Sequence, residues 1–229
     1  MEKILLIFLG VLLIGNVLAS QIFEQQVTVT VLPPKNVAYI YDSLWSIDSN
    51  IVSSFSDLNF SVDYIRCKDV SSTDFSQYGL IFVGNEELNC SYQIPVDKYS
   101  SVIMNGRDTK DLGLTSRTGA SKIASNVPLK INVSNNITQV YTIAEYNKNY
   151  LSLYFLPVYY SGFDKTGELY LRGIKYPGLA ISHINAGTTL TNGKKTNSNI
   201  CFFGLYQTEF WTDKTKELFN ECAQFAYKF

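Results

Sequence analysis

Short apolar runs separated by polar turns dominate the chain after residue 35, and most of them have the length of β-strands. Four such runs lie in the first half: residues 37–41, 62–65, 79–84 and 101–105. Between the first two, apolar residues recur at helical spacing from Leu44 to Phe55, after the helix-start signal Asp42-Ser43. This order predicts two parallel strands joined by a right-handed connection. The third run is apolar on both faces, which predicts a central strand covered by helices on both sides.

The second half of the chain has a weaker pattern. Residues 107–136 are rich in Gly, Ser, Thr and Asn and predict an irregular excursion or short accessory strands. Further strands are expected at residues 139–144, 150–160, 178–184 and 199–205. Asn192-Gly193 is the dipeptide that a type I′ hairpin turn prefers.

The chain closes with a segment whose apolar residues share one helical face from Leu218 to Phe229. Thr212 or Asp213 is expected to cap this helix at its start. No internal repeat and no linker rich in Pro or Gly divides the chain. The pattern therefore predicts one α/β domain over residues 36–229, with several parallel strands early and a hairpin late.

Residues 1–19 have the layout of a secretory signal: a charged start, an apolar run of about twelve residues, and Val17 and Ala19 placed for cleavage before Ser20. The run is shorter than the roughly 20 residues of a membrane-spanning helix. Retention as an N-terminal anchor is the alternative. Residues 20–35 are expected to form a lead-in strand or linker. We therefore expect an exported protein, extracellular or at the cell surface, with no membrane span after signal removal.

Charge and composition exclude several classes of partner. Lys and Arg number 19 against 20 Asp and Glu, for a net charge of −1, and no basic tract interrupts this balance. Nucleic acid and an anionic membrane surface are therefore not expected as partners. The content of 46% hydrophobic and 17% charged residues provides for a core and argues against disorder. The single histidine, His183, excludes His-rich metal sites.

An even number of cysteines in an exported chain predicts disulfides. Four cysteines allow three pairings, of which we favour Cys67 with Cys90 and Cys201 with Cys222, each closing a loop of just over twenty residues. Cys222 lies on the inner face of the last helix, one element after the strand that carries Cys201. Buried free thiols are the alternative.

Four Asn-x-Ser/Thr sequons make the chain a candidate glycoprotein. They begin at Asn59, Asn89, Asn132 and Asn136. In a chain this rich in Asn, Ser and Thr, one or two such matches are expected by chance. Glycosylation would require them to lie in surface loops.

Several segments resemble a known superfamily. Three of them are similar to the opening strands of the class I glutamine amidotransferase-like superfamily: residues 39–42, 78–84 and 102–106. Three more resemble the closing strands and helix of its exported, trehalose-utilisation-like members: residues 178–181, 202–205 and 218–226. The resemblance implies a flavodoxin-like three-layer α/β sandwich with a mainly parallel central sheet and late antiparallel strands. These landmarks are apolar residues and glycines, so they indicate a fold rather than an activity.

Catalytic members of the superfamily use a cysteine at a sharp turn and a His-x-Glu pair. The matching turn here is Asn105-Gly106-Arg107, which has no cysteine, and His183 has no glutamate two positions later. Cys90, after the preceding strand, lacks the flanking glycines of an exposed nucleophile. Amidotransferase or cysteine hydrolase activity is therefore not expected, and His183 is interpreted as a half-buried strand residue.

Polar residues follow three of the predicted strands at the edge where open α/β sheets bind ligands. They are Asp42, Ser43, Asn85, Glu86, Asn105, Arg107 and Asp108. Such a set suits hydrogen bonding to a sugar, or a cation held by oxygen ligands. The competing interpretation is that Asp42 and Ser43 cap a helix and that the others are ordinary loop residues.

These observations predict a non-catalytic binding or interaction module that acts outside the cell. Its partner is expected to be a carbohydrate or a cell-surface protein. No phosphate-binding glycine loop is present, so no nucleotide cofactor is expected, and neither is a metal. A glycan hydrolase that uses the strand-end carboxylates and a structural envelope component are the two alternatives.

Overall fold

The computed structural model describes most of the chain after residue 34: residues 35–116, 119–126, 128–142, 150–157, 163–171 and 174–227. The chain divides into two units, Met1–Leu32 and Pro33–Phe229, and all described residues belong to the second. The expected signal, the lead-in strand and Phe229 lie outside the described residues. None of the helices in the described part is long and apolar enough to cross a membrane.

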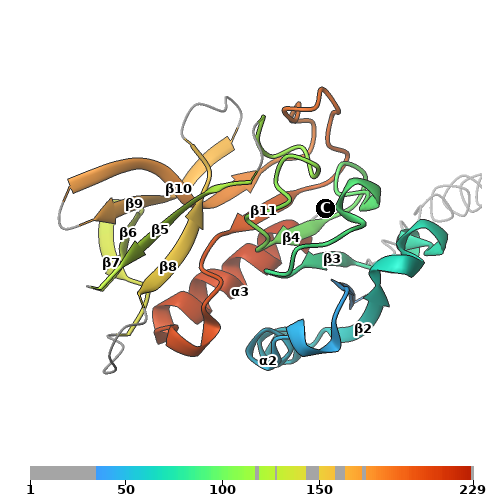
Figure 1. Cartoon of the computed structure of the whole chain (residues 1–229), viewed down its shortest axis with the longest axis horizontal. Helices are drawn as coiled ribbons and strands as arrows, with labels where there is room; N and C mark the ends of the chain where they lie inside the picture. The colour runs from blue at the N-terminus through green and yellow to red at the C-terminus, as the bar shows by residue number, and fades with distance from the viewer. Residues whose placement is uncertain are drawn as a thin grey trace, which may run out of the picture. The chain divides into compact units, whose positions relative to one another are not determined.

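Nine of the described strands form one sheet. They are β1 (Asn36–Tyr41), β2 (Ser61–Arg66), β3 (Leu80–Val83), β4 (Ser101–Ile103), β6 (Lys130–Val133), β7 (Asn136–Gln139), β9 (Phe163–Leu171), β10 (Ile174–Ile184) and β11 (Ile200–Phe203). Their order in the sheet is β2-β1-β3-β4-β11-β10-β9-β6-β7 (Figure 1). Two further strands, β5 (Ser121–Ser125) and β8 (Leu151–Phe155), pair separately and antiparallel.

Strand direction divides the large sheet into two parts. β2, β1, β3, β4 and β11 are mutually parallel. From β10 onward, every neighbouring pair is antiparallel. The predicted α/β class and the late antiparallel strands are confirmed. Residues 107–136 contain the accessory strands β5 and β6, one of the two possibilities that the sequence left open.

Two α-helices cover one face of the parallel part. They are α2 (Ser49–Asp57) and α3 (Asp213–Tyr227), and Figure 1 shows α3 lying along β4 and β11. Phe55 and Phe219 are fully buried and pack edge to face at 5.5 Å between ring centroids. The backbone N–H of Thr215 donates to the Thr212 hydroxyl at 3.2 Å, so Thr212 caps α3 as one of the two expected residues.

The other face carries no α-helix among the described residues, which corrects the expectation of helices on both sides. Short 3₁₀ helices and loops cover it instead: η2 (Cys67–Ser72), η3 (Phe75–Gln77) and η4 (Ser91–Gln93). They bury Ile81, Val83 and Ile103 on this side of the sheet. Asp74 and other short polar side chains bond to nearby backbone groups here, which favours turns over helices.

Both favoured disulfides are present. Cys67 and Cys90 join the connection that follows β2 to the connection that follows β3, on the face without α-helices. Cys201 and Cys222 join β11 to α3 inside the helix-covered core, and both residues are fully buried. All four cysteines are therefore paired in the structure.

Two local predictions are wrong in detail. The first α-helix begins at Ser49 and is capped by Asp48, because Asp42 and Ser43 instead open the 3₁₀ turn η1 (Leu44–Ser46). Asn192-Gly193 lies in a hairpin, but only Gly193 has a positive φ, of 83°. A type I′ turn needs two such residues.

Candidate functional site

The seven predicted site residues lie after β1, β3 and β4, which are neighbours in the sheet. Parallel strands end at a common edge, so these residues share one rim. The rim also coincides with a change of direction in strand order, because β1 is followed along the chain by β2 on one side and then by β3 on the other. Open α/β sheets bind ligands at such a switch point.

Glu86 is bound to the turn that follows β1. The backbone N–H groups of Asp42 and Ser43 donate to its two carboxylate oxygens at 2.8 and 2.7 Å, and the Ser46 hydroxyl also donates to it. Asn89 donates its side-chain N–H to Asp42 at 3.0 Å. These bonds satisfy the Glu86 carboxylate and hold η1 against the loop after β3.

Asn105 and Asp108 form a second network at the end of β4. The fully buried Asn105 accepts from the backbone N–H groups of Arg107 and Asp108 at 2.7 and 2.9 Å, and donates to the Asp108 carboxylate at 2.7 Å. Leu88 also donates its backbone N–H to Asp108, at 2.9 Å. Burial raises the pKa of the Asp108 carboxyl above its ordinary value. Both side chains therefore shape the loops around them.

Arg107 and Tyr154 line an open pocket of about 530 Å³. The guanidinium forms an exposed ion pair with Glu87 at 3.3 Å, and its hydrogen bond with Tyr154 raises the pKa of Arg107. The Tyr154 ring lies over Gly106, where a Cβ atom would sit 2.1 Å from it. The Asn105-Gly106-Arg107 turn is thus covered by an aromatic ring.

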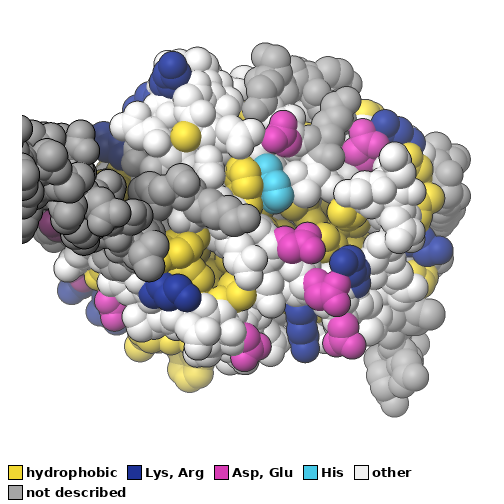
Figure 2. Space-filling view, turned by 180° about the vertical axis from the view of Figure 1, so that it is seen from behind, with side chains coloured by type: hydrophobic (Ala, Val, Ile, Leu, Met, Phe, Trp, Pro, Cys, Tyr) yellow, Lys and Arg dark blue, Asp and Glu magenta, His cyan; other side chains and the backbone are white. Residues whose placement is uncertain are grey.

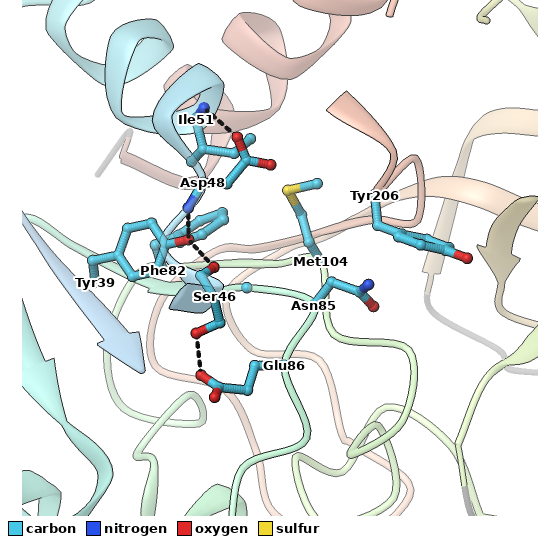
Figure 3. A pocket seen from close by; sticks show the side chains of 10 residues that line it. Tyr39, Ser46, Asp48, Ile51, Phe82, Asn85, Glu86, Met104 and Tyr206 are labelled. Atoms are coloured by element: carbon cyan, nitrogen blue, oxygen red, sulfur yellow. Dashed lines mark hydrogen bonds between the residues drawn. The ribbon is translucent and has the colours of Figure 1, made fainter. Parts of the chain in front are cut away.

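A smaller pocket of about 270 Å³ opens at the switch point (Figure 3). We call it the rim pocket. It is lined by Tyr39, Ser46, Asp48, Ile51, Phe82, Gly84, Asn85, Glu86, Met104 and Tyr206. Pockets for drug-sized ligands measure about 300–1,000 Å³, so the rim pocket suits a smaller ligand.

Most polar groups of the rim pocket are already bonded within the protein. Asp48 accepts from the backbone N–H of Asn50 at 2.9 Å and from the Thr208 hydroxyl at 2.7 Å. The Tyr39 hydroxyl accepts from the backbone N–H of Asp48 at 3.0 Å, and burial raises the pKa of Tyr39 to about 12. Tyr39 therefore remains a neutral hydrogen-bonding group at physiological pH.

Asn85 differs from these residues. Its side-chain oxygen is buried and accepts no hydrogen bond from any residue that the structure describes. Figure 3 shows its amide turned away from Glu86 and Ser46, towards Tyr206. A buried amide oxygen without a donor costs about 1–3 kcal/mol, so a turn of the amide that brings this oxygen to a ligand donor gains that interaction.

Sequence reasoning placed Asn85 and Glu86 in the site but missed the other eight residues of the rim pocket, five of which bring side chains with oxygen or sulfur atoms. These five are Tyr39, Ser46, Asp48, Met104 and Tyr206. Met104 and Tyr206 follow the ends of β4 and β11, so the strand-end rule would have found them had apolar and aromatic residues been included.

The carboxylates of the rim do not gather into a metal-binding cluster. Within the described ranges, no group of three or more His, Cys, Asp and Glu side chains is arranged to hold a metal ion. Acidic and basic side chains are also interspersed on the face shown in Figure 2, so that face presents no field of a single sign.

The four sequons differ in exposure. Asn59 is exposed in the turn after α2, with a φ of 61°, and Asn136 is exposed at the start of β7. Asn89 is exposed but bonded to Asp42. Asn132 is partly buried, and its side-chain oxygen is buried without a partner among the described residues. Asn59 and Asn136 are therefore the most accessible acceptor positions.

His183 lies in β10 and stacks on Phe225 of α3, with 4.0 Å between ring centroids and 7° between planes. Its Nε2 is buried and unpartnered among the described residues, and burial lowers the pKa of His183. The charge of Asp164, opposite His183 in β9, raises the pKa of His183, but this effect is smaller than that of burial. The geometry matches the expected half-buried strand residue.

We expect the free energy of unfolding to fall as the pH is lowered below about 6.5, the ordinary pKa of histidine. In that range the unfolded chain binds a proton at residue 183 that the folded chain resists, so protonation favours unfolding. Urea denaturation at several pH values between 7.5 and 5 would measure how steeply the free energy of unfolding falls with pH in the wild type and in His183→Gln. An equally steep fall in the variant would contradict the assignment to His183.

No protein-family model matches the chain, and no curated protein is significantly similar to it in sequence. Among solved structures, the chain resembles that of a protein named as the cytoplasmic protein STM1381 from Salmonella typhimurium LT2. The superposition has a TM-score of 0.47 at 10% identity, and covers 83% of this chain and 96% of that chain.

Proposed function

We propose that this protein is an exported, non-catalytic binding module that recognises a small polyhydroxylated ligand, of which a sugar is the prime example. The ligand occupies the rim pocket at the carboxyl ends of β1, β3 and β4. The unpartnered amide oxygen of Asn85 carries this proposal, because a sugar hydroxyl in the pocket supplies the missing donor once the amide turns this oxygen towards it.

The remaining lining of the rim pocket suits the same ligand. The Tyr206 ring is held by Tyr154, with 4.8 Å between centroids, and by the Lys122 ammonium, 5.4 Å from its centroid. The part of the ring that lines the pocket offers an apolar surface to the C–H groups of a sugar ring. Ser46, Glu86 and Tyr39 place hydroxyl and carboxylate oxygens on the opposite side. A pocket with one aromatic wall and several convergent polar groups is the usual form of a small-molecule site.

The arrangement favours binding over the alternative of a hydrolase. Glycoside hydrolysis needs two carboxyl groups that flank the scissile bond. Here Glu86 is occupied by the turn after β1, while Asp108 is occupied by Leu88 and Asn105. Asp48, the other carboxylate of the rim pocket, caps α2. A structural envelope component would not need a pocket at the switch point.

The proposal includes a flavodoxin-like strand order, although the described residues place α-helices on one face of the sheet alone, and it includes the compartment. The parallel order β2-β1-β3-β4-β11 matches the flavodoxin-like order 2-1-3-4-5, which supports the resemblance to the glutamine amidotransferase-like superfamily. The two disulfides support an oxidising compartment and hence export. We propose Asn59 and Asn136 as glycan acceptors if the host glycosylates secreted proteins.

The test is a thermal-shift screen of the purified protein against mono- and oligosaccharides, with Asn85→Leu as the variant. A ligand present at 100 times its Kd adds about 2.7 kcal/mol to the free energy of unfolding. For a chain of this size that corresponds to a rise in Tm of roughly 5–10 °C. We expect Asn85→Leu to lose this rise, because leucine has a similar size but cannot accept a hydrogen bond.

Asn89→Leu is the matched control, since Asn89 follows the same strand, is exposed and does not line the rim pocket, and Glu86 still holds η1 when the bond from Asn89 to Asp42 is lost. It should retain the ligand-induced rise in Tm. The Tm of each variant without ligand reports its folding. A rise that persists in Asn85→Leu, or no rise with any saccharide, contradicts the proposed function.

A further inference from the structure

Trp45 is the most exposed large apolar side chain that the structure describes. Its side chain is 97% exposed, and its neighbour Leu44 is 60% exposed. The other tryptophan, Trp211, is buried and donates its indole N–H to the Leu205 carbonyl at 2.7 Å. Indole rings are usually buried in large part, so a ring that is almost wholly in water requires an explanation.

The backbone beneath Trp45 is held in place by hydrogen bonds. The backbone N–H of Ser46 donates to the Ser43 carbonyl at 3.0 Å, and that of Trp45 donates to the Ser43 hydroxyl at 3.4 Å. Glu86 anchors the same turn through Asp42, Ser43 and Ser46. The indole is therefore presented from a fixed turn, and little backbone entropy is lost when a ligand binds to it.

This turn belongs to the rim pocket. Ser46, the residue after Trp45, lines the pocket together with Glu86 (Figure 3). Consecutive Cα atoms are about 3.8 Å apart, so the backbone that carries the exposed indole borders the mouth of the pocket. The rim pocket, at about 270 Å³, has room for one sugar ring, and a longer saccharide would have to extend across its border.

The surroundings of Trp45 favour a saccharide over a membrane surface. The acidic residues Asp42, Asp48 and Glu86 lie within three positions of η1 in sequence or are bonded to it. Anionic lipid headgroups would be repelled there. A neutral sugar ring is not repelled by these carboxylates, and it has an apolar face that stacks on indole.

We infer that Trp45 is a stacking subsite for a second sugar unit, and that the ligand is accordingly an oligosaccharide rather than a single sugar. This inference rests on the proposed function, because the first unit occupies the rim pocket. Asn85 bonds to the sugar unit in the pocket, and Trp45 packs against the next unit outside it.

Isothermal titration of the purified protein with glucose, N-acetylglucosamine and their linear tetrasaccharides tests the inference. We expect the tetrasaccharide of the preferred sugar to bind the wild type about tenfold more tightly than the monosaccharide, which corresponds to about 1.4 kcal/mol and lies within the range for one aromatic contact. In Trp45→Ala this advantage should disappear while the monosaccharide affinity is kept. Binding of the tetrasaccharide should also shift the fluorescence of Trp45, with buried Trp211 contributing a constant background.

Leu44→Ala is the matched control, because it removes an exposed apolar side chain from the same turn without removing a ring. It should leave both affinities unchanged. Equal tetrasaccharide affinity in Trp45→Ala and wild type overturns the inference but leaves the proposed function intact, provided that the monosaccharide binds. Binding of no saccharide by the wild type overturns both. Sedimentation with neutral phosphatidylcholine vesicles that is lost in Trp45→Ala and Leu44→Ala alike would assign the turn to a membrane instead.

Discussion

Replacing Cys201 and Cys222 together by alanine is expected to lower the free energy of unfolding by about 3 kcal/mol, the value for a loop of this length. The sequence separation of the two cysteines is 21 residues, and both are fully buried between β11 and α3. Their loss frees the unfolded chain and also leaves space in the core. For a chain of this size the Tm should fall by roughly 6–12 °C, which calorimetry would measure.

Thiol counting provides the control for this experiment. The unfolded wild type should contain no reactive thiol without a reductant, since all four cysteines are paired. The Cys201→Ala/Cys222→Ala variant should show the same, because the bond between Cys67 and Cys90 remains. Reactive thiols in the wild type, or a loss in stability well below about 1 kcal/mol, would show that the Cys201–Cys222 bond does not support the fold.

The second large effect is expected from Gly204→Ala, just after β11. Gly204 donates its backbone N–H to Ala180 at 2.7 Å and accepts from the backbone N–H of Tyr154 at 2.9 Å, so it links β10 to β8. A Cβ atom at this position would lie 2.1 Å from the Tyr154 carbonyl oxygen and 3.2 Å from that of Ala180. Both obstacles are backbone atoms, so the variant should lose about 3 kcal/mol or more, measured by urea denaturation.

Gly193→Ala separates steric crowding from backbone preference. Gly193 has a φ of 83°, but a Cβ atom there would meet no atom within 4 Å. Only the left-handed conformation is penalised, at about 1–2 kcal/mol. If Gly204→Ala were no more destabilising than Gly193→Ala, the packing of β8 on β11 would have to be looser than the structure shows.

The central parallel strands β3 and β11 could be predicted because their side chains are buried on both faces. β3 and β11 are entirely buried and appear in the sequence as uninterrupted apolar runs. Both disulfide pairings could also be predicted, since Cys222 shares the buried face of α3 with Leu218. In each case the positions of apolar residues in one short segment show which side of that strand or helix is buried.

The start of the first α-helix was placed too early for a reason that no local pattern contains. Asp42-Ser43 is a valid start signal, but Glu86 takes both backbone N–H groups from 43 or 44 positions away. Such a contact depends on β1 and β3 being neighbours in the sheet. The same error concealed Asp48 as the cap of α2 and thus as a residue of the rim pocket.

Of the seven predicted site residues, Asn85 and Glu86 line the rim pocket, and the sequence does not indicate which polar groups there are free. Strand ends locate the rim, yet the sequence does not reveal that Asp108 and Glu86 are satisfied by loops while Asn85 is not. Hydrogen-bond partners at long sequence separation decide which polar groups remain for a ligand. The type I′ turn shows the same limit, because Ser134 and Asn135, rather than Asn192-Gly193, have the required pair of positive φ values.

The sheet face covered by η2, η3, η4 and loops leads us to expect a defined order of maturation. These 3₁₀ turns have few internal hydrogen bonds, so the layer that they form depends on the covalent link between Cys67 and Cys90 more than a helical layer would. Cys90 follows Asn85 and Glu86 by only a few residues in the same connection. We therefore expect the sheet to form first and oxidation to complete the rim pocket afterwards. With the proposed ligand and the proposed export, recognition would begin only after the chain has left the reducing compartment in which it was made.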